Sequence, residues 1–317
     1  MFKQRIYIND VGVRDGFQIE KSFIPTETKI AFIDQLSKTG LAKIEATSFV
    51  HPKFVPNMAD AETVLANIQR MAGVRYTALT PNIKGMDRAI ACHQSGAAID
   101  EMNLFMSASE THNMANVKRT TAQSLQDFAE MVPMAKRVGI RTNGTVSTSF
   151  GCPFEGVVSD ARVMEIAEKY LAIGFDSLTF ADTTGMANPR QVERMMRDAK
   201  QRFSDIEITL HFHNTRGMGL ANVVAGIAAG VVHYDASIAG LGGCPFAPGA
   251  TGNICTEDLV NMLQDMGLDT GIDLDKLLAA AVKIPAIVGH DVPGQVMKAG
   301  KTMHLHPVPE KLYTEDI

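Results

Sequence analysis

Two histidines, His211 and His213, are separated by a single residue within the segment Ile-Thr-Leu-His-Phe-His-Asn. Alternate residues of a β-strand point to the same side of the sheet, so both imidazoles would face the same way. The β-branched and apolar residues before the pair, and Asn214 and Gly217 after it, place it at the end of a predicted strand, where a loop begins. Two aligned imidazoles are half of a metal site. An isolated pair could equally be structural, so the other ligands must come from elsewhere in the sequence.

Polar side chains also lie at the ends of other predicted strands. They are Arg14 and Asp15, Glu45 and Ser48, Asp182 and, in the loop after the eighth strand, Asn253. A carboxylate added to two imidazoles suits a divalent cation, and the carbonyl of Asn253 would add an oxygen ligand. Each residue alone has a structural alternative, since Arg14 could form a salt bridge with Glu45 or Asp182. Asp15 could simply form a turn, but the joint occurrence of these residues favours a chemical site.

Short strand-like runs alternate with longer amphipathic runs along the chain. The eight predicted strands are Ile6–Asn9, Lys43–Thr47, Arg75–Leu79, Glu101–Phe105, Arg141–Ser147, Ser177–Ala181, Glu207–Phe212 and Val232–Ile238. The predicted helices between them include Thr26–Gly40, Ala61–Ala72, Thr121–Val138, Asp160–Ile173, Pro189–Phe203 and Met218–Ala229. Eight such units predict an α/β fold with a parallel sheet closed into a (β/α)8 TIM barrel. Its active site would lie at the carboxyl ends of the strands.

The chain continues beyond the eighth predicted strand. Two additional C-terminal helices are predicted near Thr256–Met266 and Leu274–Val288, and the segment from about Gly289 to Ile317 has little periodicity. No linker divides the chain, so residues 1–317 are predicted to form a single catalytic domain. Residues 289–317 would be a C-terminal tail or arm, serving as a lid or an oligomer contact.

The composition excludes several classes of protein. The 317 residues carry a net charge of -5 without a block of lysine or arginine, which argues against nucleic-acid binding. No apolar run approaches the roughly 20 residues that span a bilayer, so no membrane association is expected. The four cysteines share no CxxC spacing and indicate reduced thiols in a cytoplasmic protein. Neither a dinucleotide fingerprint nor a P-loop motif occurs, so no nucleotide cofactor is expected.

The segment from Gly240 to Asn253 contains five glycines and two prolines among fourteen residues. Such a loop can approach a ligand closely and move as a lid. Cys244 lies between a glycine and a proline with little apolar sequence to justify its burial, so a reactive thiol is more plausible there than at Cys92 or Cys255. Cys152, in a similar Gly-Cys-Pro setting, is the competing candidate, although it could equally cap a turn.

These segments together resemble the 3-hydroxy-3-methylglutaryl-CoA lyase family, which consists of metal-dependent TIM-barrel enzymes related to the Claisen-condensing synthases. The resemblance covers about residues 5–285. The matching segments are Val11–Gln18, Ile44–Val50, Leu79–Asn82, Ser107–Glu110, Gly151–Gly156, Ala181–Gly185, His211–Asn214 and Gly240–Asn253. The condensing relatives resemble one another in a Gly-Glu-Arg-x-Gly-Asn loop. This chain has the cysteine-containing loop instead, which favours a lyase.

The resemblance implies a ligand set and a reaction. A divalent cation, magnesium or manganese, would be held by Asp15, His211, His213 and Asn253. The substrate-binding residues would be Arg14, Gln18, Ser48 and Arg216, with Arg14 facing the thioester carbonyl. Glu45 or Asp182 would hold Arg14 and Asp15 in position, and Cys244, His211 or Asp15 would transfer the proton. The implied reaction cleaves 3-hydroxy-3-methylglutaryl-CoA, or a close 3-hydroxy-3-alkylglutaryl-CoA, to acetyl-CoA and acetoacetate or the matching 3-oxo acid.

The chain departs from the family pattern after the histidine pair. Many relatives have an aspartate and a tyrosine where this chain has Asn214 and Arg216. The extra cation of Arg216 could meet a CoA phosphate, a substrate carboxylate or a neighbouring acid. These changes leave the implied ligands intact and leave open the size of the alkyl branch on the substrate.

Two other functions stay open on the sequence alone. One is a Claisen-type acyltransferase that joins acetyl-CoA to a 2-oxo acid, which the cysteine-containing loop disfavours. The other is a non-catalytic metal-binding barrel, which the joint presence of Arg14, Asp15 and Cys244 disfavours. The resemblance also implies a place in leucine degradation or ketone-body formation. An acyl-CoA is the expected partner and a homodimer the expected assembly.

Overall fold

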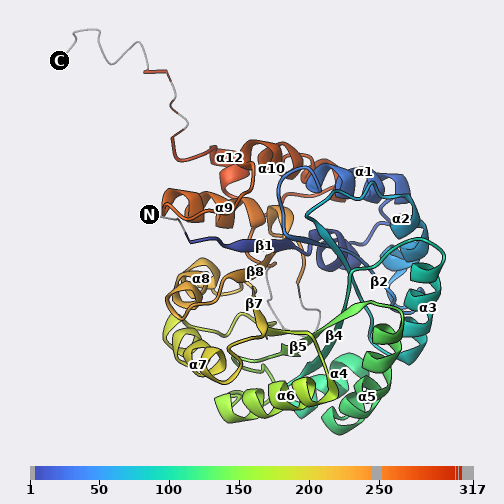
Figure 1. The fold of residues 1–317 in the computed structure, drawn as a ribbon. Coiled ribbons are helices and arrows are strands. Elements are labelled where there is room, and N and C mark those ends of the chain that lie inside the picture. The colour runs from blue at the N-terminus through green and yellow to red at the C-terminus, as the bar shows by residue number, and fades with distance from the viewer. Residues whose placement is uncertain (1–3, 244–251, 304, 306, 309–317) are drawn as a thin grey trace.

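The computed structural model describes residues 4–243, 252–303, 305, 307 and 308. Eight parallel strands close into a barrel in sequence order, with β8 paired to β1 (Figure 1). They are β1 (Tyr7–Asp10), β2 (Lys43–Ser48), β3 (Arg75–Leu79), β4 (Glu101–Ser107), β5 (Arg141–Ser147), β6 (Ser177–Asp182), β7 (Glu207–Phe212) and β8 (His233–Ala236). The predicted barrel is confirmed, and every predicted strand overlaps an observed one.

Helices surround the barrel as an outer ring (Figure 1). Those between strands are α1 (Thr26–Leu36), α2 (Ala61–Asn67), α3 (Ile83–Gln94), α4 (Glu110–Val117), α5 (Thr121–Arg137), α6 (Asp160–Ile173), α7 (Pro189–Arg202) and α8 (Gly219–Ala228). The predicted C-terminal helices are also present, as α9 (Thr256–Asp265), α10 (Leu274–Ala281), α11 (Ile284–Val288) and α12 (Val296–Ala299). Within the predicted tail, α12 contacts α9 and α10, so this part of the tail packs against the C-terminal helices.

The structure adds detail to the predicted helices in two places. Helices α3 and α4 form between β3 and β4 and directly after β4, outside the helical ranges named from the sequence. Both start at side-chain caps, since Asn82 accepts a hydrogen bond from the Gly85 N–H and Ser109 accepts one from the His112 N–H. The single predicted helix over 274–288 is divided into α10 and α11, because Pro285 has no N–H to continue the helical hydrogen bonds. None of the helices in the described residues is long and apolar enough to cross a membrane.

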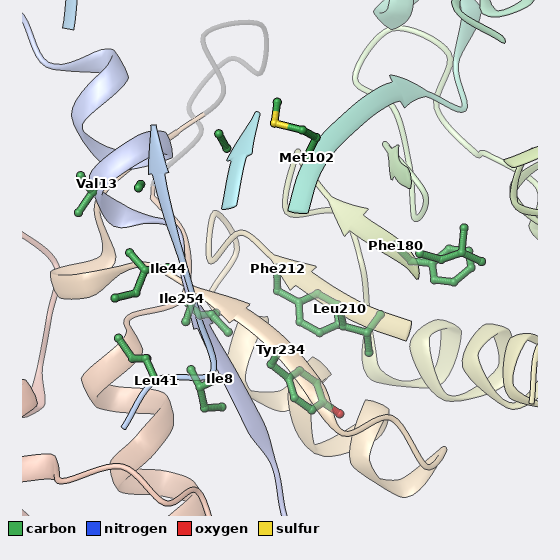
Figure 2. Close-up of a cluster of buried hydrophobic side chains, with 14 of the residues drawn as sticks. Ile8, Val13, Leu41, Ile44, Met102, Phe180, Leu210, Phe212, Tyr234 and Ile254 are labelled. Carbon is green, nitrogen blue, oxygen red and sulfur yellow. The ribbon is translucent and has the colours of Figure 1, made fainter. Parts of the chain in front are cut away.

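The apolar core lies between the barrel and the helices. Ile8, Ile44, Leu210 and Tyr234 belong to it, each from a different strand (Figure 2). The intervening strand residues face the barrel axis, and many are polar: Asn9, Thr77, Asn103, Asn143, Thr179 and Thr209. Barrels of this fold usually fill the axis with branched apolar side chains. Here the polar side chains line a cavity of about 980 Å³ together with apolar ones such as Leu79 and Phe105, so the cavity suits a ligand with both polar and apolar parts.

Ion pairs close the barrel at the amino-terminal ends of the strands. The Lys43 Nζ, on the first residue of β2, lies 2.7 Å from a carboxylate oxygen of Glu101 and 2.6 Å from one of Glu207. An Arg75 nitrogen lies 2.9 Å from the other oxygen of Glu207. Burial alone would raise the pKa of Glu207, but Lys43 and Arg75 lower it to about 2. Folding therefore stabilises the ionised form of this carboxyl group.

Replacing Glu207 by glutamine should lower the free energy of unfolding by about 1–3 kcal/mol near neutral pH, because Lys43 and Arg75 lose a buried partner. A carboxylate with a depressed pKa contributes stability above its unfolded pKa of 4.5 and loses it as the pH falls towards 2. The difference between the wild type and Glu207→Gln should therefore shrink across that interval. Urea unfolding followed by circular dichroism at several pH values measures it. A constant difference would contradict the assignment, and Glu165→Gln, which breaks an exposed pair with Lys169, is the control.

Candidate active site

The chain turns sharply between β1 and α1, and this turn carries the first site residues. Residues Gly12–Gly16 form a single π-helical turn that presents Arg14 and Asp15 at the carboxyl end of β1. Such turns are rare and concentrate at functional sites. Asp10 holds this one, since it accepts hydrogen bonds from the Gly12 N–H at 2.9 Å and from the Thr256 hydroxyl at 2.6 Å. Burial raises the pKa of Asp10 to about 6.

Arg14 is held from two sides by carboxylates. Its Nη1 donates to the Asp15 Oδ1 at 2.7 Å, and its Nε donates to Glu45 on β2. The amide of Asn103, on β4, donates to the other oxygen of Glu45. The side chain of Arg14 is only 12% exposed, so its guanidinium keeps a fixed position at the cavity wall. Of the two acids predicted to hold Arg14, Glu45 does so.

Asp15 and the two histidines come together at the same end of the barrel. One ligand atom from each of Asp15, His211 and His213 lies within 4.8 Å of the other two. Burial alone would raise the pKa of Asp15, but Arg14 and the two imidazoles hold it below its usual range. The site therefore contains an ionised carboxylate beside two imidazoles, which is a donor set that fits a divalent cation.

Asn253 completes this group. The backbone of Asn253 bridges to His213, and its Nδ2 donates to the Asp15 Oδ2 at 2.7 Å and to the Leu241 carbonyl at 3.0 Å. Its Oδ1 is buried and has no hydrogen-bond partner among the described residues. A buried carbonyl oxygen without a partner is costly unless a ligand satisfies it. The predicted ligands are thus brought together, and the orphaned oxygen fits a cation.

Glycines allow the loop after β8 to approach the site closely. At Gly242, which has a φ of +100°, an added Cβ would lie 2.6 Å from the Asn253 Nδ2 and 2.8 Å from the Asp15 Oδ2. At Gly252 it would lie 1.8 Å from the Gly240 carbonyl oxygen. Only glycine fits both positions, so the ends of the glycine-rich loop pack directly against the candidate metal ligands.

The cavity opens beside these residues. Arg14, Asp15, Gln18, Glu45, His211 and His213 all line it, and Gln18 also donates to the Asp15 Oδ1 at 3.1 Å. The cavity continues past Asn103 to Lys43 and Glu101, which begin their strands at the far end of the barrel. The mouth includes Phe54 from the loop after β2 and Lys118 from the α4–α5 connection. A long ligand could thus enter from the mouth with its reactive end at Arg14 and Asp15.

Three predicted site residues lie elsewhere. Asp182 accepts a hydrogen bond from the Met186 N–H at 2.7 Å, and burial raises its pKa to about 6, so it orders the loop after β6 rather than holding Arg14. Ser48 is fully buried, and its hydroxyl accepts from the Val50 N–H at 3.3 Å. Arg216 donates to the backbone carbonyls of the β6–α7 loop at 3.1 and 2.9 Å. Neither Ser48, Asp182 nor Arg216 is among the residues found to line the cavity.

The two candidate thiols differ in what the structure says of them. Cys244 lies outside the described residues. Cys152 is fully buried, and its Sγ donates to the Ser109 hydroxyl at 3.1 Å and accepts from the Phe154 N–H. Its backbone pairs with Gly156 across a tight turn. This is the turn-capping alternative considered for Cys152, and it leaves Cys244 as the candidate for chemistry.

The HMGL-like family model matches residues 5–284 of this sequence. The chain belongs to this family. It is similar to the hydroxymethylglutaryl-CoA lyase YngG of Bacillus subtilis, with 42% identity over 95% of this chain and 99% of that protein. The human mitochondrial hydroxymethylglutaryl-CoA lyase is 40% identical over 93% of this chain and 90% of its own length. A solved HMG-CoA lyase from Acinetobacter baumannii, in complex with coenzyme A and 3-methylmalate, is 49% identical with a TM-score of 0.92. The match covers 98% of this chain and 99% of that one.

The family assignment made from sequence motifs is confirmed, but two residues of this HMGL-like enzyme's site escaped the sequence analysis. Asn103 supports Glu45, and Asp235 on β8 lies 3.4 Å from the Nδ1 of His211. Burial alone would lower the pKa of His211, but Asp235 and Asp15 raise it. Their positions in the sequence could have identified them. Both residues alternate with buried apolar residues on strands that were correctly predicted, which places them on the inner face of the barrel.

Proposed function

We propose that this protein is a divalent-metal-dependent carbon–carbon lyase that cleaves 3-hydroxy-3-methylglutaryl-CoA to acetyl-CoA and acetoacetate. One observation carries the proposal: the cluster of Asp15, His211 and His213, with the orphaned oxygen of Asn253, lies beside Arg14 at a large cavity. The high identity to proteins named hydroxymethylglutaryl-CoA lyases supports it, as does the coenzyme A bound to the Acinetobacter baumannii relative.

The metal ligands in this proposal are Asp15, His211, His213 and the side-chain oxygen of Asn253. Oxygen and imidazole donors suit magnesium or manganese, and we propose one of these ions. When bound, the cation would act as a Lewis acid that favours loss of the substrate's hydroxyl proton. Asp15 suits this role because its lowered pKa keeps it ionised at neutral pH.

Arg14 would stabilise the charge that develops during cleavage. Loss of the tertiary hydroxyl proton turns that carbon into a ketone, the neighbouring carbon–carbon bond breaks, and its electrons move into an acetyl-CoA enolate. A fixed guanidinium beside the thioester oxygen would stabilise this enolate in the manner of an oxyanion hole. Glu45 holds Arg14 in place without needing to contact the substrate. Gln18, which lines the cavity beside Asp15, is the second proposed substrate contact.

The proton must leave the hydroxyl group and finally reach the methylene carbon of the enolate. Asp15 is a weak base because its pKa is lowered, and both nitrogens of His211 are occupied once it binds the cation, so Cys244 is the better candidate for these transfers. We propose Cys244 as the thiol that acts from the glycine-rich loop, which would also exclude water from the enolate. Ser48 and Arg216, by contrast, make protein contacts in the structure and would reach the substrate only if those contacts changed.

A direct assay tests this proposal. Purified protein with magnesium or manganese and 3-hydroxy-3-methylglutaryl-CoA should release acetyl-CoA and acetoacetate in equal amounts. A panel with longer alkyl branches at the tertiary carbon would then define the substrate. Absence of cleavage across the whole panel would overturn the proposal. Acceleration of CoA release from acetyl-CoA by a 2-oxo acid would instead support a condensing acyltransferase, which the sequence disfavours.

The remaining features of the proposal concern context. We propose that residues 1–317 act as one catalytic unit in a cytoplasmic homodimer, and that the lyase serves leucine degradation or ketone-body formation. Sedimentation equilibrium would measure the assembly. Growth of a deletion strain on leucine as carbon source would test the metabolic role.

A further inference from the structure

Three inward-facing polar residues lie in one row across three neighbouring strands. Asp235 on β8 is in direct register with His211 on β7 and with Asn9 on β1. All three line the cavity at the barrel axis. The row exists because the strands are parallel and β8 closes the barrel between the first strand and the seventh. Residues far apart in the sequence thus become direct neighbours beside the candidate metal ligands.

The contacts along this row are directional. The Asn9 Nδ2 donates to the Asp235 Oδ1 at 2.8 Å, and the Asp235 Oδ2 lies 3.4 Å from the Nδ1 of His211. Asn9 is almost fully buried, and the side chains of Asp235 and His211 are 16% and 12% exposed. Within the described part of the chain, Asp235 forms no ion pair with a lysine or an arginine. The imidazole of His211 is its ion-pair partner among these residues, and the charge of Asp235 also acts on the Arg14 guanidinium.

We propose that Asp235 is a positioning residue for His211 and that Asn9 in turn positions Asp235. The carboxylate favours the imidazole tautomer that carries its proton on Nδ1, which leaves Nε2 as the nitrogen that can bind a cation. The negative charge of Asp235 also makes Nε2 more basic and therefore a stronger ligand for a cation. Carboxylates that accept a hydrogen bond from the other nitrogen of a metal-bound histidine generally have this effect. This inference deepens the proposed function and rests on its metal site.

A purely structural role for Asp235 would predict something different. A residue that only stabilises the barrel would change the melting temperature without changing metal affinity. The neighbouring Asn9 offers a second test of the same row, since its Oδ1 has no hydrogen-bond partner among the described residues. Its replacement by leucine removes one donor to Asp235 and leaves the charge of the row unchanged.

The experiment measures Mn²⁺ binding to the full-length protein by electron paramagnetic resonance of the free ion. Asp235→Asn should raise the dissociation constant about 10- to 100-fold. Asn9→Leu should raise it less, and adding it to Asp235→Asn should cause little further loss, because both variants act through one contact chain. Glu20→Gln is the matched control, because it removes a carboxylate from another histidine, His290, that is not a candidate ligand. Its affinity should equal that of the wild type.

A second measurement reads the tautomer directly. In metal-free protein labelled with ¹⁵N-histidine, His211 should carry its proton on Nδ1 in neutral form, and Asp235→Asn should move part of that population to Nε2. Unchanged Mn²⁺ affinity and an unchanged tautomer in a folded Asp235→Asn protein would overturn the inference. Failure of the wild type to bind Mn²⁺, or full binding by His213→Ala, would instead overturn the proposed metal site. Thermal melting without metal confirms that each variant is folded.

Discussion

Replacing Arg14 by lysine should lower kcat by about 10²- to 10³-fold. The substitution keeps one positive charge but removes the planar guanidinium whose N–H groups would face the enolate oxygen. Arg14 donates from separate nitrogens to Glu45 and Asp15, a geometry that a single ammonium group cannot reproduce. The KM for the thioester should change less than kcat, since the charge on the oxygen develops mainly in the transition state. Steady-state kinetics with saturating metal measures both constants.

The control for this variant is Arg88→Lys. Arg88 forms a comparable two-nitrogen pair with Glu62, at 2.9 and 3.0 Å, on the surface between α2 and α3. Its replacement should leave kcat unchanged.

Arg14→Lys should retain the melting temperature better than Arg14→Met, which would leave two buried carboxylates without a cation. A kcat equal to that of the wild type in Arg14→Lys would show that the guanidinium does not act on the reacting oxygen.

The sequence predicted the barrel and the grouping of the candidate metal ligands largely from short-range patterns. Alternation places His211 and His213 on one side of β7, and the strand-helix alternation places the ends of β1 and β7 at one rim. Asp15 and Asn253 were linked to the histidines by their positions after other strands, and the family resemblance made the four residues one specific ligand set. The orphaned oxygen of Asn253 gives that assignment a physical basis that the sequence lacked.

The structure distinguishes between alternatives that the sequence left open at the strand ends. Asp182 and Glu45 are both acids at strand ends, but only Glu45 faces Arg14, because the loop after β6 offers Asp182 the N–H of Met186 instead. Arg216 donates to backbone carbonyls of the β6–α7 loop, and its charge also acts on the carboxylate of Asp182. Such choices depend on loop geometry at the scale of a single hydrogen bond, which residue type and spacing do not determine.

Asp235 was not predicted as a site residue, for a different reason. Its importance depends on the register between β7, β8 and β1, and register becomes visible only when the barrel is closed. The polar barrel axis was readable in principle, since β4 and β5 alternate residues such as Asn103 and Asn143 with apolar or small ones. That pattern ordinarily indicates a solvent-exposed sheet face. In a closed barrel it indicates a hydrated, ligand-accessible interior.

Replacing His213 by alanine should remove both bound metal and activity. His213 is 4% exposed and belongs to a cluster whose ligand atoms lie within 4.8 Å of one another, and the metal-ligating cluster found in the described residues contains one carboxylate and two imidazoles, so its loss leaves one imidazole. Metal content measured by mass spectrometry after dialysis should fall to the level of chelator-treated wild type. Cleavage of 3-hydroxy-3-methylglutaryl-CoA should fall to background in both samples. Chelator-treated wild type should recover when magnesium or manganese is restored, whereas His213→Ala should not.

The control for this substitution is His290→Ala, at an exposed histidine paired with Glu20. Its metal content and activity should match those of the wild type. Loss of the His213 imidazole also removes buried packing, so melting temperatures must be compared in the absence of metal, where the two proteins should differ by only a few degrees. Addition of metal should then raise the melting temperature of the wild type alone, because only a protein that binds the ion in its folded state gains stability from it. Unaltered metal content in folded His213→Ala would rule out this histidine as a ligand. The proposed ligand set of Asp15, His211, His213 and Asn253 would then be wrong.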